Sequence, residues 1–91
     1  MADIVVDSLA ESEDRFSFRV TVSEELSSST HEVTLSRPDY ERLARDDEPA
    51  GDFVRRCFEF LLEREPKESI LSRFDISVIG RYFPEFEDTI K

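Results

Sequence analysis

The residue types that most often perform chemistry are scarce in this sequence. His31 and Cys57 are each the only residue of their kind, whereas nucleophilic triads and transition-metal sites combine several such groups. Cys57 falls on the apolar side of a predicted helix, where burial raises the pKa of a thiol and makes it unreactive. His31 falls on a predicted strand, and we expect it to lie half-exposed on the face of a sheet. We therefore predict no catalytic residue, no metal ligand and no internal disulfide.

Carboxylates are abundant, but none of them forms an arrangement typical of acid–base catalysis. A catalytic pair places one acid in an apolar setting and a second acid opposite it. Glu63 and Glu65 flank Arg64 at the end of a predicted helix, where solvent exposure accounts for their charge. The acidic run at residues 46–48 lacks the spaced oxygens and the central glycine of a calcium loop. With only two glycines, the chain also lacks the glycine-rich loop of a nucleotide site, and we expect no cofactor.

The charge of the chain is high and unevenly distributed. There are 22 acidic and 12 basic residues, and of the net charge of −10, residues 1–50 carry −8 (5 − 13) and residues 51–91 carry −2 (7 − 9). Such acidity is typical of proteins in a salt-rich cytoplasm, where salt screens carboxylate repulsion, and equally of a protein that meets a basic partner. Duplex binding depends on neutralising phosphates, so we do not expect a nucleic-acid partner.

The N-terminal third predicts strands. Residues 15–23 alternate strictly between apolar and polar side chains, which is typical of a strand with one buried face. Residues 30–35 alternate more weakly, and the serine-rich loop at 23–29 joins the two strands into an antiparallel hairpin. Residues 4–6 predict a short third strand, which the acidic segment 8–14 connects to the hairpin.

From residue 36 onward the spacing becomes that of helices. Ser36 and Pro38 form a helix start, and the charged segment 46–51 ends that helix. Residues 52–64 predict the central helix, because their apolar side chains cover an arc of about 200° at 100° per residue. So wide an apolar surface needs the sheet on one side and further helices on the other.

The last third predicts shorter elements that cover the central helix. A turn or short helix at residues 67–74 inserts three apolar side chains, Ile70, Leu71 and Phe74. Asp75 then caps a further helix, which Pro84 ends. We expect Phe86 and Ile90 to hold the tail against the rest of the chain.

These elements predict one α+β domain at residues 1–91, with a three-stranded antiparallel N-terminal sheet followed by three or four helices packed on one face. The first residues have no basic start and no long apolar run, so we expect no signal peptide. No stretch approaches the roughly 18 apolar residues of a membrane span. We therefore expect a cytoplasmic protein without a membrane partner.

Residues 58–86 resemble a segment of a family of small prokaryotic proteins without an assigned function. The resemblance rests on a Ser-x-x-Asp-Tyr-Glu-Arg-Leu stretch at 36–43, an EREP-x-x-SIL-x-x-F segment at 63–74, and a Tyr-Phe-Pro end at 82–84. Including these flanks, it covers residues 30–88. It implies strands with a hairpin followed by a helix, and it implies no activity.

By exclusion, we predict a non-catalytic protein-interaction or regulatory module and not an enzyme. Four side chains form the candidate docking surface: Arg64, Arg73, Arg81 and Tyr82. The acidic first half is the other candidate surface, since an uneven charge selects oppositely charged partners. The simplest such interaction is a homodimer, formed through apolar surface left uncovered at Phe86 and Ile90. A nucleic-acid-associated regulator and a small enzyme with an unrecognised carboxylate site are the alternatives.

Overall fold

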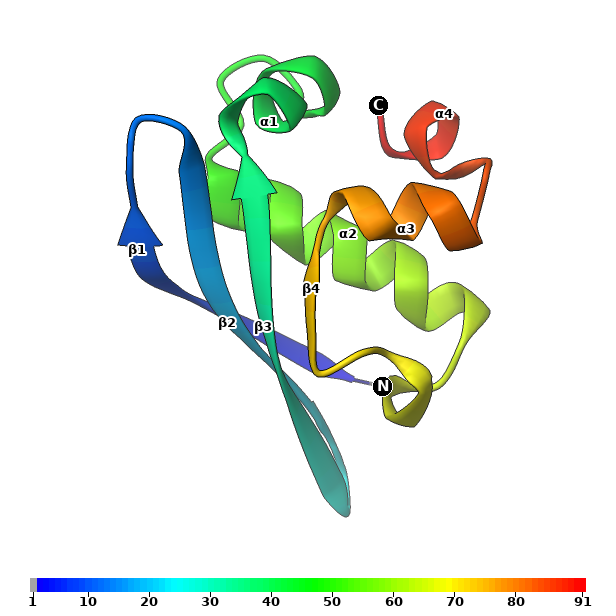
Figure 1. Cartoon of the computed structure of the whole chain (residues 1–91). Coiled ribbons are helices and arrows are strands. Elements are labelled where there is room, and N and C mark those ends of the chain that lie inside the picture. Colours follow the sequence, from blue (N-terminus) through cyan, green and yellow to red (C-terminus); the bar gives the residue numbers. More distant parts are fainter. Residues whose placement is uncertain (1) are drawn as a thin grey trace.

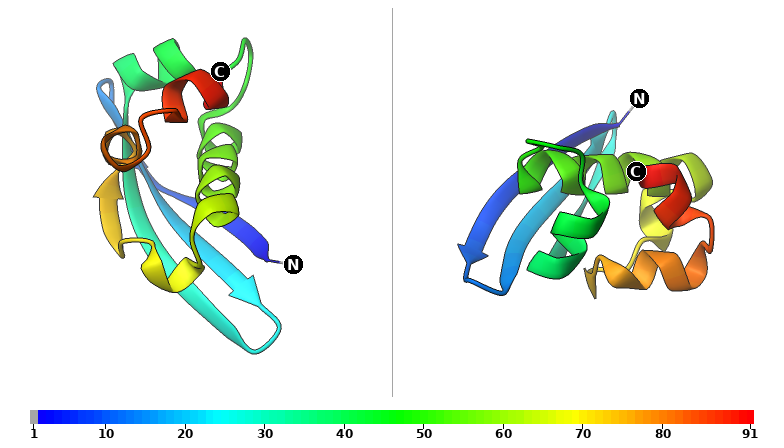
Figure 2. Two further views of the ribbon diagram at one scale, coloured as in Figure 1. Left: turned by 90° about the vertical axis from the view of Figure 1, so that its right-hand side faces the viewer. Right: turned by 90° about the horizontal axis from the view of Figure 1, so that it is seen from above.

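The structure is a computed structural model that describes residues 2–91. It has two layers, a sheet and a set of helices that lie on one face of it (Figures 1 and 2). The strands are β1 (Asp3–Glu11), β2 (Arg15–Glu24), β3 (Ser27–Ser36) and β4 (Arg73–Asp75). The helices are α1 (Arg37–Leu43), α2 (Ala50–Arg64), α3 (Ser77–Tyr82) and α4 (Phe86–Ile90), with the 3-10 turn η1 (Lys67–Ser69) between α2 and β4.

The sheet is mixed, with the strands in the order β1-β2-β3-β4. The first three strands pair antiparallel, as predicted. β4, however, pairs in parallel with β3, so the prediction of a three-stranded antiparallel sheet is wrong in its strand count. The prediction of a turn or short helix at residues 67–74 is confirmed by η1 at its start and is wrong at its end, where β4 begins at Arg73. A strand of three residues is too short to show the alternation by which strands are recognised.

The antiparallel strands are longer than predicted. β1 runs to Glu11, so most of the segment predicted as an acidic connector is strand, with a shift of register between Ser8 and Ala10. β3 begins at Ser27, and only Glu25 and Leu26 lie between β2 and β3. Backbone hydrogen bonds extend these strands into segments where neither face of the sheet is buried. Such segments do not alternate between apolar and polar side chains, so the sequence pattern does not reveal them.

The core lies between α2 and the inner face of the sheet. β2 contributes the alternating apolar residues of the prediction, which are buried: Phe16, Phe18, Val20 and Val22. α2 buries the side of the helix that its apolar arc predicted, including Phe53, Cys57 and Phe58, each fully covered. The Phe58 ring lies 6.0 Å from the ring of Phe74, so the central helix touches the segment that forms β4.

The predicted cap at Ser36 is confirmed by a hydrogen bond, whereas the predicted cap at Asp75 is one residue early, because Ile76 takes the N-cap position of α3. The Ser36 hydroxyl accepts from the N–H of Asp39 at 3.2 Å and caps α1. The Asp75 carboxylate accepts from the N–H of Ser77 at 3.1 Å at the start of α3. α2 begins at Ala50, two residues before the predicted start.

The C-terminal helix α4 contains the two apolar residues that were predicted to hold the tail. Phe86 and Ile90 are only 1% and 4% exposed, and the Phe86 ring meets the ring of Phe60 at a centroid distance of 5.1 Å. Arg56 donates to the carbonyl of Ile90. The tail is held as predicted, but the uncovered apolar surface predicted as the basis of a homodimer is absent at these two residues.

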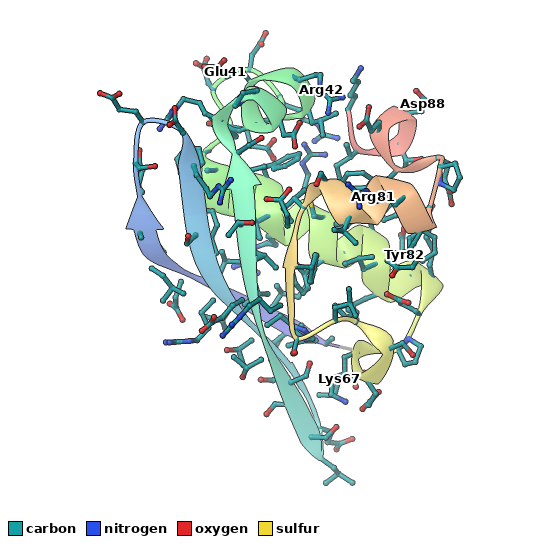
Figure 3. The ribbon with its side chains drawn as sticks, viewed as in Figure 1. Glu41, Arg42, Lys67, Arg81, Tyr82 and Asp88 are labelled. Atoms are coloured by element: carbon teal, nitrogen blue, oxygen red, sulfur yellow. The ribbon has the colours of Figure 1, made fainter. Side chains whose placement is uncertain are left out.

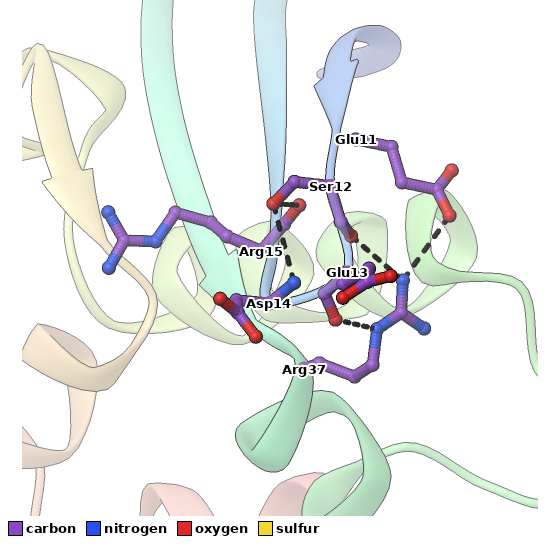
Figure 4. A network of polar contacts seen from close by, with 6 residues as sticks. All are labelled: Glu11, Ser12, Glu13, Asp14, Arg15 and Arg37. Atoms are coloured by element: carbon purple, nitrogen blue, oxygen red, sulfur yellow. Dashed lines mark hydrogen bonds and ion pairs between the residues drawn. The ribbon is translucent and has the colours of Figure 1, made fainter.

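Arg37, the first residue of α1, fixes the acidic turn between β1 and β2 (Figure 4). Its guanidinium donates to the carbonyls of Glu13 and Ser12 at 2.6 and 3.1 Å and pairs with Glu11 at 3.3 Å. It also lies 4.6 Å from the centroid of the Phe16 ring. The sheet and the first helix are therefore joined at this end of the molecule. Within residues 2–91, no helix has the length and apolarity that crossing a membrane requires.

We predict that Phe58→Ala lowers the free energy of unfolding by about 3–5 kcal/mol, because it opens a cavity between α2, β3 and β4. Urea denaturation followed by circular dichroism measures the change. Leu26→Ala is the control, since the Leu26 side chain is 97% exposed, and it should change stability by less than about 0.5 kcal/mol. Equal, small effects of both substitutions would contradict the assignment of Phe58 to the core.

Candidate docking groove

An apolar groove opens between the C-terminal end of α2, the segment from η1 to β4, and α3. Its volume is about 350 Å³, within the range of sites that hold a small ligand or a few side chains. The floor is formed by buried side chains from all three segments: Leu61, Ile70, Phe74 and Ile79. The walls carry Leu71, Val78, Tyr82 and Phe83. The polar lining residues are Glu65 and Ser69, together with the hydroxyl of Tyr82.

Two exposed hydrophobic side chains lie on the rim of this groove. Leu71 is 47% exposed and Tyr82 is 68% exposed, and both line the same concave surface. The prediction that Leu71 is inserted into the core is wrong, because Ile70 and Phe74 take the inward positions on either side of it. Exposed apolar area is unfavourable in water, and an occupant that covered it would bind through the hydrophobic effect.

His31 anchors the wall that carries Leu71. Its Nδ1 lies 2.7 Å from the Leu71 carbonyl oxygen and its Nε2 lies 2.8 Å from the Ser29 hydroxyl. Because a carbonyl only accepts, Nδ1–H donates to Leu71, and Nε2 shares the second hydrogen bond with the Ser29 hydroxyl. The predicted half-exposed position is wrong: His31 is 2% exposed, since the chain that leads into β4 passes beside β3 and covers it.

Further hydrogen bonds join the same wall to β3. The N–H of Glu32 donates to the Ser72 carbonyl at 2.9 Å, and the N–H of Ile76 donates to the Thr34 carbonyl at 2.8 Å. The Thr34 hydroxyl donates to the Asp75 carboxylate at 2.5 Å. With the bond from the N–H of Ser77 to the Asp75 carboxylate, these bonds join the start of α3 to the sheet. The groove is therefore preformed.

The charge of Asp75 is stabilised where it stands. Burial opposes its ionisation, but the hydrogen bonds from Thr34 and Ser77 outweigh burial and lower the pKa of the Asp75 carboxyl below its ordinary value. Ionisation of the Asp75 carboxyl therefore stabilises the folded state.

Lys67 holds the other end of the wall (Figure 3). Its side chain is 3% exposed, and its Nζ donates to Glu24 and Glu68, each at 2.6 Å. These bonds, first from Glu24 and then from Glu68, raise the pKa of the Lys67 ammonium. The pair with Glu24 joins η1 to the end of β2. Nothing in the sequence around Lys67 indicated that this lysine is covered.

The four predicted docking residues stand in different relations to the groove. Tyr82 lines the groove, but Arg64, Arg73 and Arg81 do not. Arg64 lies 3.6 Å from the centroid of the Phe60 ring and pairs with Glu85 at 3.2 Å. Arg81 is exposed on α3 directly before Tyr82 (Figure 3), about 100° around the helix from it.

Arg73 belongs to a row of alternating charges on the outer face of the sheet. The strand register places Asp7 beside Arg19, Arg19 beside Glu32 and Glu32 beside Arg73, and Arg73 pairs with Glu32 at 3.1 Å. Opposite charges on neighbouring strands stabilise a sheet modestly. The charge of Arg73 is therefore explained by its place in this row, without a partner protein.

Across residues 2–91, no three His, Cys, Asp or Glu side chains are placed to hold a metal ion. Burial raises the pKa of the Cys57 thiol far above its ordinary value.

Comparisons with known proteins give one similarity. No family model matches the chain, and no solved structure matches it. The chain is similar to the phosphate-specific transport system accessory protein PhoU homolog 1 of Mycobacterium leprae (strain TN), at 33% identity over 70 residues. The match covers 74% of this chain and 31% of that protein, so the chain spans less than a third of the relative's length.

We predict that Asp75→Asn destabilises the protein near neutral pH and that this loss shrinks in acid. The ionised carboxylate stabilises the folded state above the ordinary pKa of 3.8, and this contribution disappears as pH falls through the lower pKa of the folded state. Chemical denaturation at several pH values, from about 6 down to about 2, measures it. Asp46→Asn, at an exposed position, should follow the wild type throughout. A difference between Asp75→Asn and wild type that is constant with pH would contradict the assignment.

Proposed function

We propose that this chain is a non-catalytic protein-interaction module, with an accessory or regulatory role, that binds a partner protein through the groove. The observation that carries the proposal is the position of Leu71 and Tyr82, which are exposed at the rim of a concave apolar surface. Aromatic and aliphatic anchors in a well-packed pocket supply most of the energy at protein interfaces.

The fixed wall supports this proposal. A surface that is ordered before binding avoids the entropic cost of ordering on association. The bonds from His31, Glu32 and Ile76 hold the groove in one shape. A partner side chain can therefore enter without rearranging the fold.

The similarity to an accessory protein of a phosphate-specific transport system fits a module of this kind. The second-half arginines give no support to the nucleic-acid alternative, because Arg64 and Arg73 pair with glutamates instead of forming a stripe free of carboxylates. The enzyme alternative has no support in the groove, where Glu65 has no second acid opposite it among the lining residues.

We predict that Leu71→Glu abolishes partner capture, because it places a charge in the apolar rim. The tagged protein is used to capture proteins from a native lysate, and a captured protein is then purified and titrated. Its affinity for Leu71→Glu should fall by at least about tenfold.

Leu26→Glu is the matched control, since it makes the same change at an exposed leucine of the β2–β3 turn, outside the groove. It should bind like the wild type, and thermal melts should show both variants folded. Undiminished binding by Leu71→Glu, or equal loss in both variants, would refute the groove as the docking site.

A further inference from the structure

The groove has one charged lining residue, and its charge is negative. Glu65 is the C-cap residue of α2 and one of the residues that line the groove. Within residues 2–91 it forms no ion pair, whereas its neighbour Arg64 turns to Phe60 and Glu85. Glu65 is partly buried, so its attraction for a cation is less screened than that of a fully exposed carboxylate.

The end of α2 adds to this negative potential. The last carbonyls of a helix have no partner within the helix, and they carry a partial negative charge. Glu65 stands at that end of a helix of 15 residues. On the opposite wall, the exposed ring of Tyr82 offers an aromatic face, which attracts a cation as well.

A second copy of this chain is a poor occupant. The most exposed hydrophobic side chain outside the groove, Leu26 at 97% exposed, is directly preceded in the β2–β3 turn by Glu25. If Leu26 entered the groove, Glu25 would bring a second negative charge to Glu65, and two chains with a net charge of −10 each repel one another.

We propose that the occupant is a cationic amphipathic segment of the partner protein. This inference rests on the proposed function. An aliphatic or aromatic side chain of the segment fills the groove over Leu61 and Ile79, and a Lys or Arg beside it pairs with Glu65 and lies near the Tyr82 ring. The charge of the partner segment is thus selected by Glu65, and its apolar anchor by the groove.

Three labelled peptides test the inference by fluorescence anisotropy. Each is an amphipathic helix of about 18 residues, or five turns, with leucine on one face. The other face carries lysine, glutamine or glutamate. The lysine peptide should bind the wild type most tightly, and Glu65→Lys should weaken it by about tenfold while strengthening binding of the glutamate peptide.

Glu41→Lys is the control, because it changes the net charge equally on α1, away from Tyr82 (Figure 3). It should alter each affinity by less than about twofold. Equal weakening by Glu41→Lys and Glu65→Lys would show that the overall field attracts the peptide, and it would overturn the inference.

Leu71→Glu separates the two proposals. If it abolishes binding of the glutamine peptide while Glu65→Lys has no effect on any peptide, the groove is a docking site without selection for charge, and only the present inference fails. If none of the peptides binds, or if Leu71→Glu changes nothing, the groove itself fails as the site.

Discussion

The pairing of β4 with β3 is the contact on which the groove depends. After α2 and η1 the chain returns to the sheet, and the ladder at residues 73–75 holds it there together with the bonds from His31 and Thr34. This return covers Phe58 with Phe74 and sets α3 beside the end of α2. It also directs Leu71 outward. One contact therefore completes the core and creates the exposed apolar rim.

The excess of carboxylates sets the second constraint. Several arginines are used to hold peripheral segments: Arg37 holds the first turn, and Arg56 binds Glu48 at 2.7 and 2.8 Å in the α1–α2 loop. The bond to Arg56 lowers the pKa of Glu48, whose side chain is 11% exposed, and removing either partner would leave a poorly solvated charge. Arg64, the base next to Glu65 in the sequence, pairs with Glu63 and Glu85, and Glu65 forms no ion pair within residues 2–91.

The central helix could be predicted from the sequence because its apolar arc is both long and wide, and Ser36 could be identified because capping is local chemistry. β4 could not, since its three residues acquire their pairing from β3, which lies about 40 positions away. The burial of His31 and the outward direction of Leu71 could not be predicted for the same reason, because the two residues that contact each other are 40 positions apart. Tyr82 was identified at the candidate site, whereas the directions of Arg64 and Arg73 depend on glutamates that only the fold brings near.

The central claim is that the groove wall is fixed to β3 before any partner arrives. Hydrogen exchange of the backbone amides in the unliganded protein tests it most directly. The amides of Glu32 and Ile76, which bond to Ser72 and Thr34 across this contact, should be as strongly protected as the amide of Val20 in the centre of the sheet. If both exchange as fast as the amide of Leu26 in the exposed turn, the wall is not fixed and the account is contradicted.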